Sequence, residues 1–248
     1  MLAFEMVGAT DIGNVRTSNE DSLKMVPNIN LAVVADGMGG HKAGDIASAM
    51  AVTTLCNYFE EQSLISQNLG SDAPNGMASD FMPEAFSLAN SEVYASSHQL
   101  AHCEGMGTTL LAASFGEDSI QIGHIGDSRL YRFRKGELAQ ITVDHTLATD
   151  MMQDSQSNHI PAYAHHVLKK ALGIESSCVP DYLDLTPEKN EIYLMCSDGL
   201  CGVVSDHDIS TILSLRANEP EHCIETLIHA ALEAGAPDNI SIILVFVR

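Results

Sequence analysis

Residues Leu31-Ala-Val-Val-Ala-Asp-Gly-Met-Gly-Gly-His41 form a short apolar run that stops abruptly on a carboxylate, followed by three glycines. An apolar run bounded by a glycine cluster is typical of a buried strand, so Asp36 is expected where this strand leaves the core. The glycines leave the backbone beside Asp36 open to close approach by another group. Apolar residues then recur at helical spacing from Lys42 to Gln62, which predicts that Asp36 lies on a strand-to-helix turn.

The composition limits the class of protein. The chain has 248 residues, 12 of them basic and 33 acidic, for a net charge of −21. Such a charge repels nucleic acid and anionic membranes and favours cations as partners. Because no linker-like stretch divides the chain, we predict one domain over residues 1–248. The sequence contains no secretory signal and no membrane span, and its six cysteines mostly lie within apolar patterns, which predicts a cytoplasmic protein with reduced thiols.

The rest of the chain alternates strand-like and helix-like segments. We predict helices at 42–62, from Pro83 to Gly105, and at 167–172, and two more after the apparent capping boxes that begin at Ser205 and Asn218. The stretches 63–82 and 144–166 are polar and irregular, and we expect the second to project as a flap over the substrate. Strands are predicted at 4–10, 22–26, 31–36, 108–115, 119–124, 129–134, 137–142, 191–196 and 240–247, the four between 108 and 142 as an antiparallel meander.

Carboxylates recur where predicted strands meet turns. Asp36, Asp198 and Asp238 each occupy such a junction, and Glu20, Asp21 and Asp127 lie in comparable turns. Any one of them is well explained as a turn former or helix cap. Six in such positions, in a chain with few basic residues, favour bound divalent cations, and all-oxygen ligation favours Mg²⁺ or Mn²⁺ over zinc. Two such ions about 4 Å apart could activate a water for attack on a phosphoryl group.

Arg16 is the one basic residue of the loop between the first two predicted strands. A guanidinium group matches the oxygens of a phosphate monoester in a bidentate manner, so Arg16 is a candidate phosphate ligand. The alternative role is a salt bridge to Asp11 or Glu20.

Seven short motifs follow one another along nearly the whole chain. They are Asp11-Ile-Gly13 with Arg16-Thr-Ser-Asn-Glu-Asp21, Ala35-Asp-Gly-Met-Gly-Gly-His41, Gly105-Met-Gly-Thr-Thr109, Gly126-Asp-Ser-Arg129, Asp144-His145, Ser197-Asp-Gly-Leu200 and Pro237-Asp-Asn-Ile-Ser241. In this order, they closely resemble the motifs of the bacterial PPM, or type 2C, metal-dependent serine/threonine protein phosphatases. The seven together are highly specific.

The resemblance implies an α+β fold, a β-sandwich of two antiparallel sheets flanked by pairs of helices, with a dinuclear Mn²⁺ or Mg²⁺ site at one end. It implies that Asp36 bridges both ions and that Glu20 acts through a metal-bound water. It further implies that Arg16 holds the substrate phosphate and that residues 146–166 form the flap. The remaining implied ligands are the Gly37 carbonyl for one ion, Asp198 and Asp238 for the other, and Asp127 with Asp198 for a third, weaker ion.

One position departs from the eukaryotic pattern. Met38 stands where those enzymes carry a histidine proposed as general acid, and a thioether cannot donate a proton. His41 is the nearby candidate for protonating the leaving alkoxide, with a metal-bound water as the alternative donor. His41 is equally well explained as a solvent-facing residue at the start of a helix.

These observations predict a phosphatase that hydrolyses phosphoserine and phosphothreonine in proteins phosphorylated by a serine/threonine kinase. The alternatives are a pseudophosphatase that binds phosphoproteins without turnover and a hydrolase of small phosphate esters. Intact Asp36, Asp198 and Asp238 argue against the pseudophosphatase.

Overall fold

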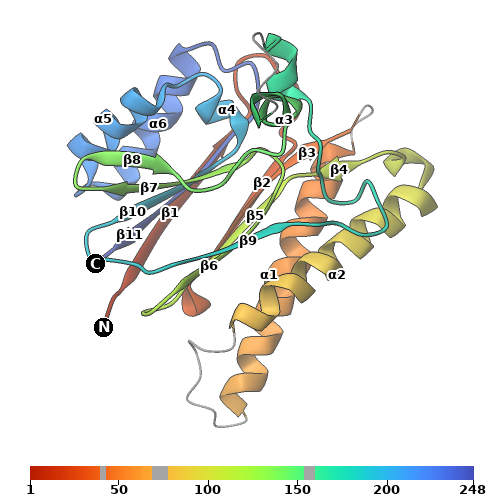
Figure 1. Ribbon diagram of the computed structural model, residues 1–248, viewed down its shortest axis with the longest axis horizontal. Helices are drawn as coiled ribbons and strands as arrows, with labels where there is room; N and C mark the ends of the chain where they lie inside the picture. Colours follow the sequence, from red (N-terminus) through yellow and green to blue (C-terminus); the bar gives the residue numbers. More distant parts are fainter. Residues whose placement is uncertain (40–42, 69–77, 154–159) are drawn as a thin grey trace.

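The computed structural model describes residues 1–39, 43–68, 78–153 and 160–248. Two antiparallel sheets lie face to face, and helices cover the outer face of each (Figure 1). This is the α+β sandwich predicted above. The C-terminal part of β3, the short helix α4 and the helix α3 gather at one end of the sandwich in Figure 1.

Each sheet combines strands from distant parts of the chain. In the first sheet the order is β1 (Phe4–Asp11), β11 (Ile240–Val247), β10 (Ile192–Cys196), β7 (Arg129–Arg134) and β8 (Glu137–Gln140). In the second the order is β2 (Asp21–Val26), β3 (Leu31–Met38), β5 (Leu110–Phe115), β6 (Ile120–Ile125) and β9 (Asp181–Leu185), with β4 (Gly107–Thr108) paired to the end of β3.

The helices pack as two pairs. α1 (Gly44–Asn68) and α2 (Ala78–Gln99) cover the second sheet, whereas α5 (Asp206–Arg216) and α6 (Pro220–Glu233) cover the first. Shorter helices are α3 (Leu147–Gln153), α4 (Asp198–Cys201) and the 3₁₀ turns η1 (Pro27–Ile29), η2 (Ala101–Cys103) and η3 (Ala162–His166). Among the described residues, no helix is long and apolar enough to cross a membrane.

Three apolar clusters explain why β3 and β11 read as continuous apolar runs. In β3, Val33 packs toward α1 and α2, whereas Val34 packs between the sheets. In β11, Leu244 packs toward α5 and α6, whereas Val245 packs between the sheets. Side chains on successive strand residues point to opposite faces, so a strand covered on both sides must be apolar throughout.

The strands predicted at 108–142 do not form one meander. The chain leaves β6 in the second sheet and enters β7 in the first, so β5 pairs with β6 and β7 pairs with β8. The turn from Gly126 to Ser128 therefore crosses between the sheets, and it carries Asp127 to the end of the sandwich. Strand β9 was not predicted, because Asp181–Leu185 is largely exposed and lacks an apolar pattern.

Three helix predictions were wrong in detail. Pro83 lies inside α2 and does not open it, because the helix begins at Ala78. Residues 167–172 form no helix but pair as isolated bridges through Leu168 and Leu172. Ser205 caps α5 by accepting a hydrogen bond from the Asp208 amide, whereas α6 begins at Pro220 without a side-chain cap.

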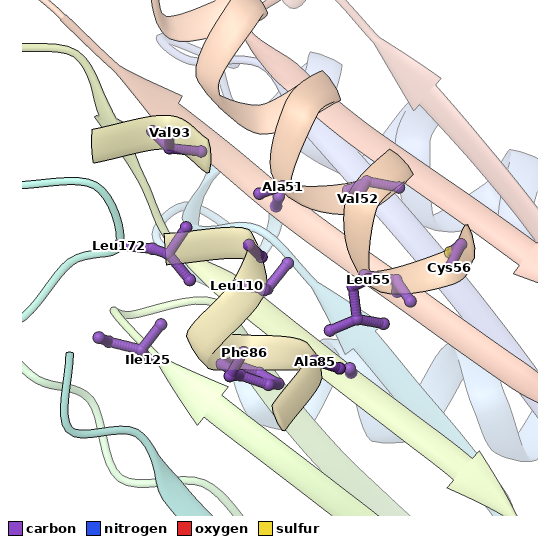
Figure 2. Close-up of a cluster of buried hydrophobic side chains, with 14 of the residues drawn as sticks. Ala51, Val52, Leu55, Cys56, Ala85, Phe86, Val93, Leu110, Ile125 and Leu172 are labelled. Carbon is purple, nitrogen blue, oxygen red and sulfur yellow. The ribbon is translucent and has the colours of Figure 1, made fainter. Parts of the chain in front are cut away.

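The buried cluster between the second sheet and its helices should contribute strongly to stability. Leu55 on α1 is fully buried there (Figure 2), whereas Leu64 on the same helix is 59% exposed. Leu55→Ala should lower the free energy of unfolding by about 2–5 kcal/mol, because it removes buried methyl groups and leaves a cavity. Leu64→Ala should change it by less than about 0.5 kcal/mol in the same urea titration. Equal effects of the two substitutions would contradict the packing described.

Candidate metal and phosphate site

The end of the sandwich holds a cavity of about 740 Å³ that brings together most of the predicted site residues. Its walls include Arg16, Glu20, Asp36, Gly37, Asp127, Asp198 and Asp238. They come from three strand ends and two loops, and they span more than two hundred positions of sequence. The cavity lies within the size range of small-molecule sites.

Asp36 lies on β3, and both its amide and its carbonyl are hydrogen-bonded to Thr108 or Thr109. Its amide donates to Thr109 Oγ1 at 2.8 Å, and its carbonyl accepts from the Thr109 amide at 2.9 Å and from Thr108 Oγ1 at 2.9 Å. The next residue, Gly37, donates its amide to the Glu20 carbonyl at 3.1 Å. A Cβ atom at Gly37 would collide with the Gly44 carbonyl, so only glycine fits between the strand and α1.

Asp198 begins α4 directly after β10, and its Oδ1 atom is buried without a hydrogen-bond partner among the described residues. Helix α4 packs closely on the start of β11, since a Cβ atom at Gly199 would collide with the Asn239 carbonyl. Close packing of this turn fixes the Asp198 backbone. A buried carboxylate oxygen without a donor is costly unless a cation or a proton neutralises it.

Asn239 ties the Arg16 loop to the strand end that carries Asp238. The Asn239 side chain accepts from the Glu20 amide at 2.8 Å and donates to the carbonyls of Ile12 at 2.9 Å and Ser18 at 3.0 Å. It is buried, and its three bonds hold both ends of the loop. Asn239 belongs to a sequence motif, but its role could not be predicted because its partners lie more than two hundred residues away.

Arg16 contacts a carboxylate that the sequence did not pair with it. Its Nη2 atom donates to Asp238 Oδ2 at 2.6 Å, so neither Asp11 nor Glu20 is its direct partner. The ion pair raises the pKa of Arg16. The Arg16 side chain is 51% exposed, and an exposed ion pair is weak enough for another anion to compete with it.

The carboxylates of the cavity repel one another strongly. Burial raises the pKa of Asp36 well above its ordinary value, and the charges of neighbouring aspartates, Asp21 first, raise it further. Burial also raises the pKa of Asp127 to about 7, with the charge of Asp198 adding to the effect. The pKa of Asp198 is raised as well, by burial and then by Asp238. A cluster of this kind favours the binding of positive charge.

Asp21 lies beneath the cavity and does not line it. Its Oδ2 atom accepts from Ser197 Oγ at 2.7 Å, while Oδ1 is buried without a partner in the described part of the chain. Burial raises the pKa of Asp21 to about 7, against the lowering effect of the Ser197 hydrogen bond. The charges of Asp198 and Asp238 also raise the pKa of Asp21, so Asp21 belongs to the same repelling cluster.

The carboxylate oxygens of the cavity suit hard divalent cations, although these side chains do not converge on one point. All the side chains offer oxygen, and Asp198 Oδ1 is an unpaired buried acceptor, as such an ion requires. Within the described ranges, no three Asp, Glu, His or Cys side chains surround a common point that could hold an ion. Asp238 is turned toward Arg16 and accepts from its Nη2 atom through Oδ2, while its Oδ1 atom accepts from the Asn239 amide at 2.8 Å.

Of two histidines relevant to the site, one was predicted and the other was not. His41 lies outside the described residues, so its role as proton donor stays a prediction. His166, which was not predicted as a site residue, lines the cavity with Nδ1 at 3.8 Å from Asp198 Oδ2. Its position depends on the fold of the 160–168 segment against the sandwich, for which the local sequence carries no signal.

The comparisons with known proteins agree with this architecture. A sequence model of the protein phosphatase 2C family matches residues 14–219, and the chain belongs to this family. It is 31% identical over 244 residues to the serine/threonine phosphatase stp of Listeria monocytogenes, covering 95% of this chain and 93% of that protein. It is 33% identical to the serine/threonine protein phosphatase PstP of Mycobacterium tuberculosis, over 98% of this chain but 45% of that longer protein.

Solved structures give the same result. The catalytic domain of PstP in complex with two manganese ions superposes with a TM-score of 0.86 at 33% identity, covering 100% of this chain and 99% of that one. The phosphatase Stp1 of Staphylococcus aureus superposes with a TM-score of 0.86 at 28% identity, covering 99% and 95%. Members of this family are metal-dependent protein phosphatases.

A histidine pair beside the cavity should make stability depend on pH. The His124 and His145 rings stack at 4.8 Å, and burial, with the charge of His145 adding, lowers the pKa of His124 to about 3. Below pH 6.5 the unfolded chain therefore binds a proton at this position that the folded chain does not. The contribution of His124 to stability thus decreases as the pH is lowered. The difference in free energy of unfolding between wild type and His124→Gln should shrink from pH 7 to pH 5 in urea titrations. A constant difference would contradict the lowered pKa.

Proposed function

We propose that this protein hydrolyses phosphoserine and phosphothreonine monoesters in proteins, with divalent cations held by the carboxylates of its cavity. One observation carries the proposal. A single exposed guanidinium group, that of Arg16, faces a set of mutually repelling carboxylates at the end of a type 2C sandwich. A phosphate monoester needs both features, since cations and an arginine together neutralise its charge.

The proposed ion ligands are those implied by the sequence. Asp36 would contact both core ions, the Gly37 carbonyl one of them, and Asp198 and Asp238 the other. Glu20 would act through a water molecule, and Asp127 with Asp198 would hold a third, weaker ion. The unpaired Asp198 Oδ1 and the raised pKa values of Asp36 and Asp127 support this assignment. Bound Mn²⁺ or Mg²⁺ would activate a water molecule as nucleophile and stabilise charge on the phosphoryl oxygens.

Arg16 is proposed to orient the substrate phosphate. It would exchange its bond to Asp238 for two bonds to phosphate oxygens, which also frees Asp238 to bind a cation. Asn239 would keep the Arg16 loop in place during this exchange, because its three hydrogen bonds do not involve the Arg16 side chain. His41 stays the proposed proton donor to the leaving alkoxide, since Met38 on the cavity wall carries no proton to donate.

We further infer that residues 1–248 act as one catalytic domain whose substrates are targets of a serine/threonine kinase. The pairing of β1 with β11 supports one domain, because it joins the two ends of the chain in the same sheet. Residues 146–166 are proposed as the flap that meets the substrate. α3 and η3, the described parts of this segment, lie near the cavity end of the sandwich, and His166 lines the cavity.

Hydrolysis of a phosphothreonine peptide should require Mn²⁺ or Mg²⁺ and should stop on addition of EDTA. Asp36→Asn and Asp198→Asn should each lower kcat/KM by about 100-fold or more, because each removes a charged ligand from the core ions. Arg16→Ala should lower it by about 10- to 100-fold through lost charge-assisted hydrogen bonds to phosphate. Initial rates over a range of metal concentrations measure all three effects.

Arg216→Ala is the matched control for Arg16→Ala. Arg216 is the last residue of α5 and also pairs with a carboxylate, that of Glu219, but it does not line the cavity. It should leave kcat/KM unchanged. Thermal unfolding with and without Mn²⁺ provides a readout apart from activity, because an ion bound to the folded state raises the melting temperature. A Mn²⁺-dependent rise without any turnover would favour a phosphoprotein-binding regulator over an enzyme.

A further inference from the structure

The cavity continues beyond the carboxylates along residues 168–179, which we call the outer wall. The outer wall contributes Lys169, Lys170, Ile174, Glu175 and Val179, among others, to the lining. Ion ligation and phosphate binding use none of these residues. The volume of about 740 Å³ therefore includes space for parts of a substrate other than its phosphate group.

The outer wall is firmly attached to the sandwich. Leu172 exchanges two backbone hydrogen bonds with Thr108, at 3.0 and 2.9 Å, and its side chain is buried in the cluster shown in Figure 2. The Gly173 amide donates to Asn90 Oδ1 at 2.8 Å, and Asn90 Nδ2 donates to the Glu175 carbonyl at 3.1 Å. A surface held in this way is already formed before a substrate arrives, which lowers the entropic cost of binding.

Two apolar side chains of the outer wall are nevertheless exposed to solvent. Ile174 is 45% exposed and Val179 is 72% exposed, although both line the cavity. A Cβ atom at Gly107 would lie 2.6 Å from Ile174 Cδ1 and 3.0 Å from Met38 Cε, so the ends of both side chains lie against Gly107. Met38 follows Asp36 and Gly37 on β3, so this apolar surface is continuous with the proposed ion site.

The lysines of the outer wall are already paired. Lys169 Nζ lies 3.3 Å from Asp150 Oδ2, and Lys170 Nζ lies 3.1 Å from Asp181 Oδ1. Glu175 adds a further negative charge to the lining. Apart from the negative charge of Glu175, the outer wall therefore offers mainly apolar contact to a bound chain.

We propose that Met38, Ile174 and Val179 form a subsite for an apolar side chain of the substrate polypeptide, close in sequence to the phosphorylated residue. This inference rests on the proposed function and specifies its substrate class. A phosphorylated side chain that reaches the carboxylates brings its flanking residues into the same cavity. An apolar side chain there would cover Ile174 and Val179 and remove their surface from water.

A set of phosphothreonine peptides tests this inference. Each peptide carries one leucine in a serine background, and the leucine occupies in turn each position from four before to four after the phosphorylated residue. Capped phosphothreonine without flanking residues is the reference substrate. Wild type should prefer leucine over serine by about tenfold in kcat/KM at one or two adjacent positions. The double variant Ile174→Ser/Val179→Ser should reduce that preference to about twofold or less, relative to the reference substrate.

The double variant Ile65→Ser/Val143→Ser is the matched control, because these residues are of the same types, are 50% and 54% exposed, and do not line the cavity. It should retain the wild-type preference. A wild type without preference at any position would overturn the subsite, as would a preference that survives in Ile174→Ser/Val179→Ser. An equal loss of activity on the reference substrate and on all peptides would also overturn it. Inactivity of wild type on every substrate would instead refute the proposed function.

Discussion

The repulsion between carboxylates at one end of the sandwich is the constraint on which the site depends. Asp36, Asp127 and Asp198 arrive from different strand ends, and burial raises the pKa of each. The chain has too few basic residues to neutralise such a cluster from within. Among the described residues, Arg16 pairs with Asp238 and not with Asp36, Asp127 or Asp198. Positive charge from outside is the remaining way to stabilise the ionised cluster, which makes metal dependence a consequence of the fold.

The sandwich supplies the rigidity that this arrangement requires. β3 and β11 are apolar on both faces, so each strand is held by the opposite sheet and by a helix pair. Asp36 lies near the C-terminal end of β3, and Asp238 lies just before the N-terminal end of β11. Glycines at 37 and 199 allow α1 and β11 to approach closely, and Asn239 joins the Arg16 loop to the same framework. Repelling groups can be kept together only where the surrounding backbone has little freedom to separate them.

The two ends of the cavity differ in chemistry. One end is strongly acidic with a single guanidinium group, and the other is apolar with paired lysines. Met38 lines the cavity between them, two residues after Asp36 on β3. Its thioether has no proton to donate, and its end lies against Gly107, as does that of Ile174. Met38 therefore extends the apolar surface of the cavity up to the carboxylates.

Much of this protein could be predicted from sequence, because strand ends, glycine turns and carboxylates occur within short segments. The strand that carries Asp36 is a local feature of this kind, although β3 continues to Met38, and the order of the motifs indicated the family. Tertiary structure alone decided that the chain crosses between sheets at Asp127, that Arg16 pairs with Asp238, and that Asn239 bonds to the Arg16 loop. It also decided that residues 168–179 are held by Thr108 and Asn90 and line the cavity. These contacts join residues far apart in the chain, and no local pattern of polarity records which distant partner a side chain will meet.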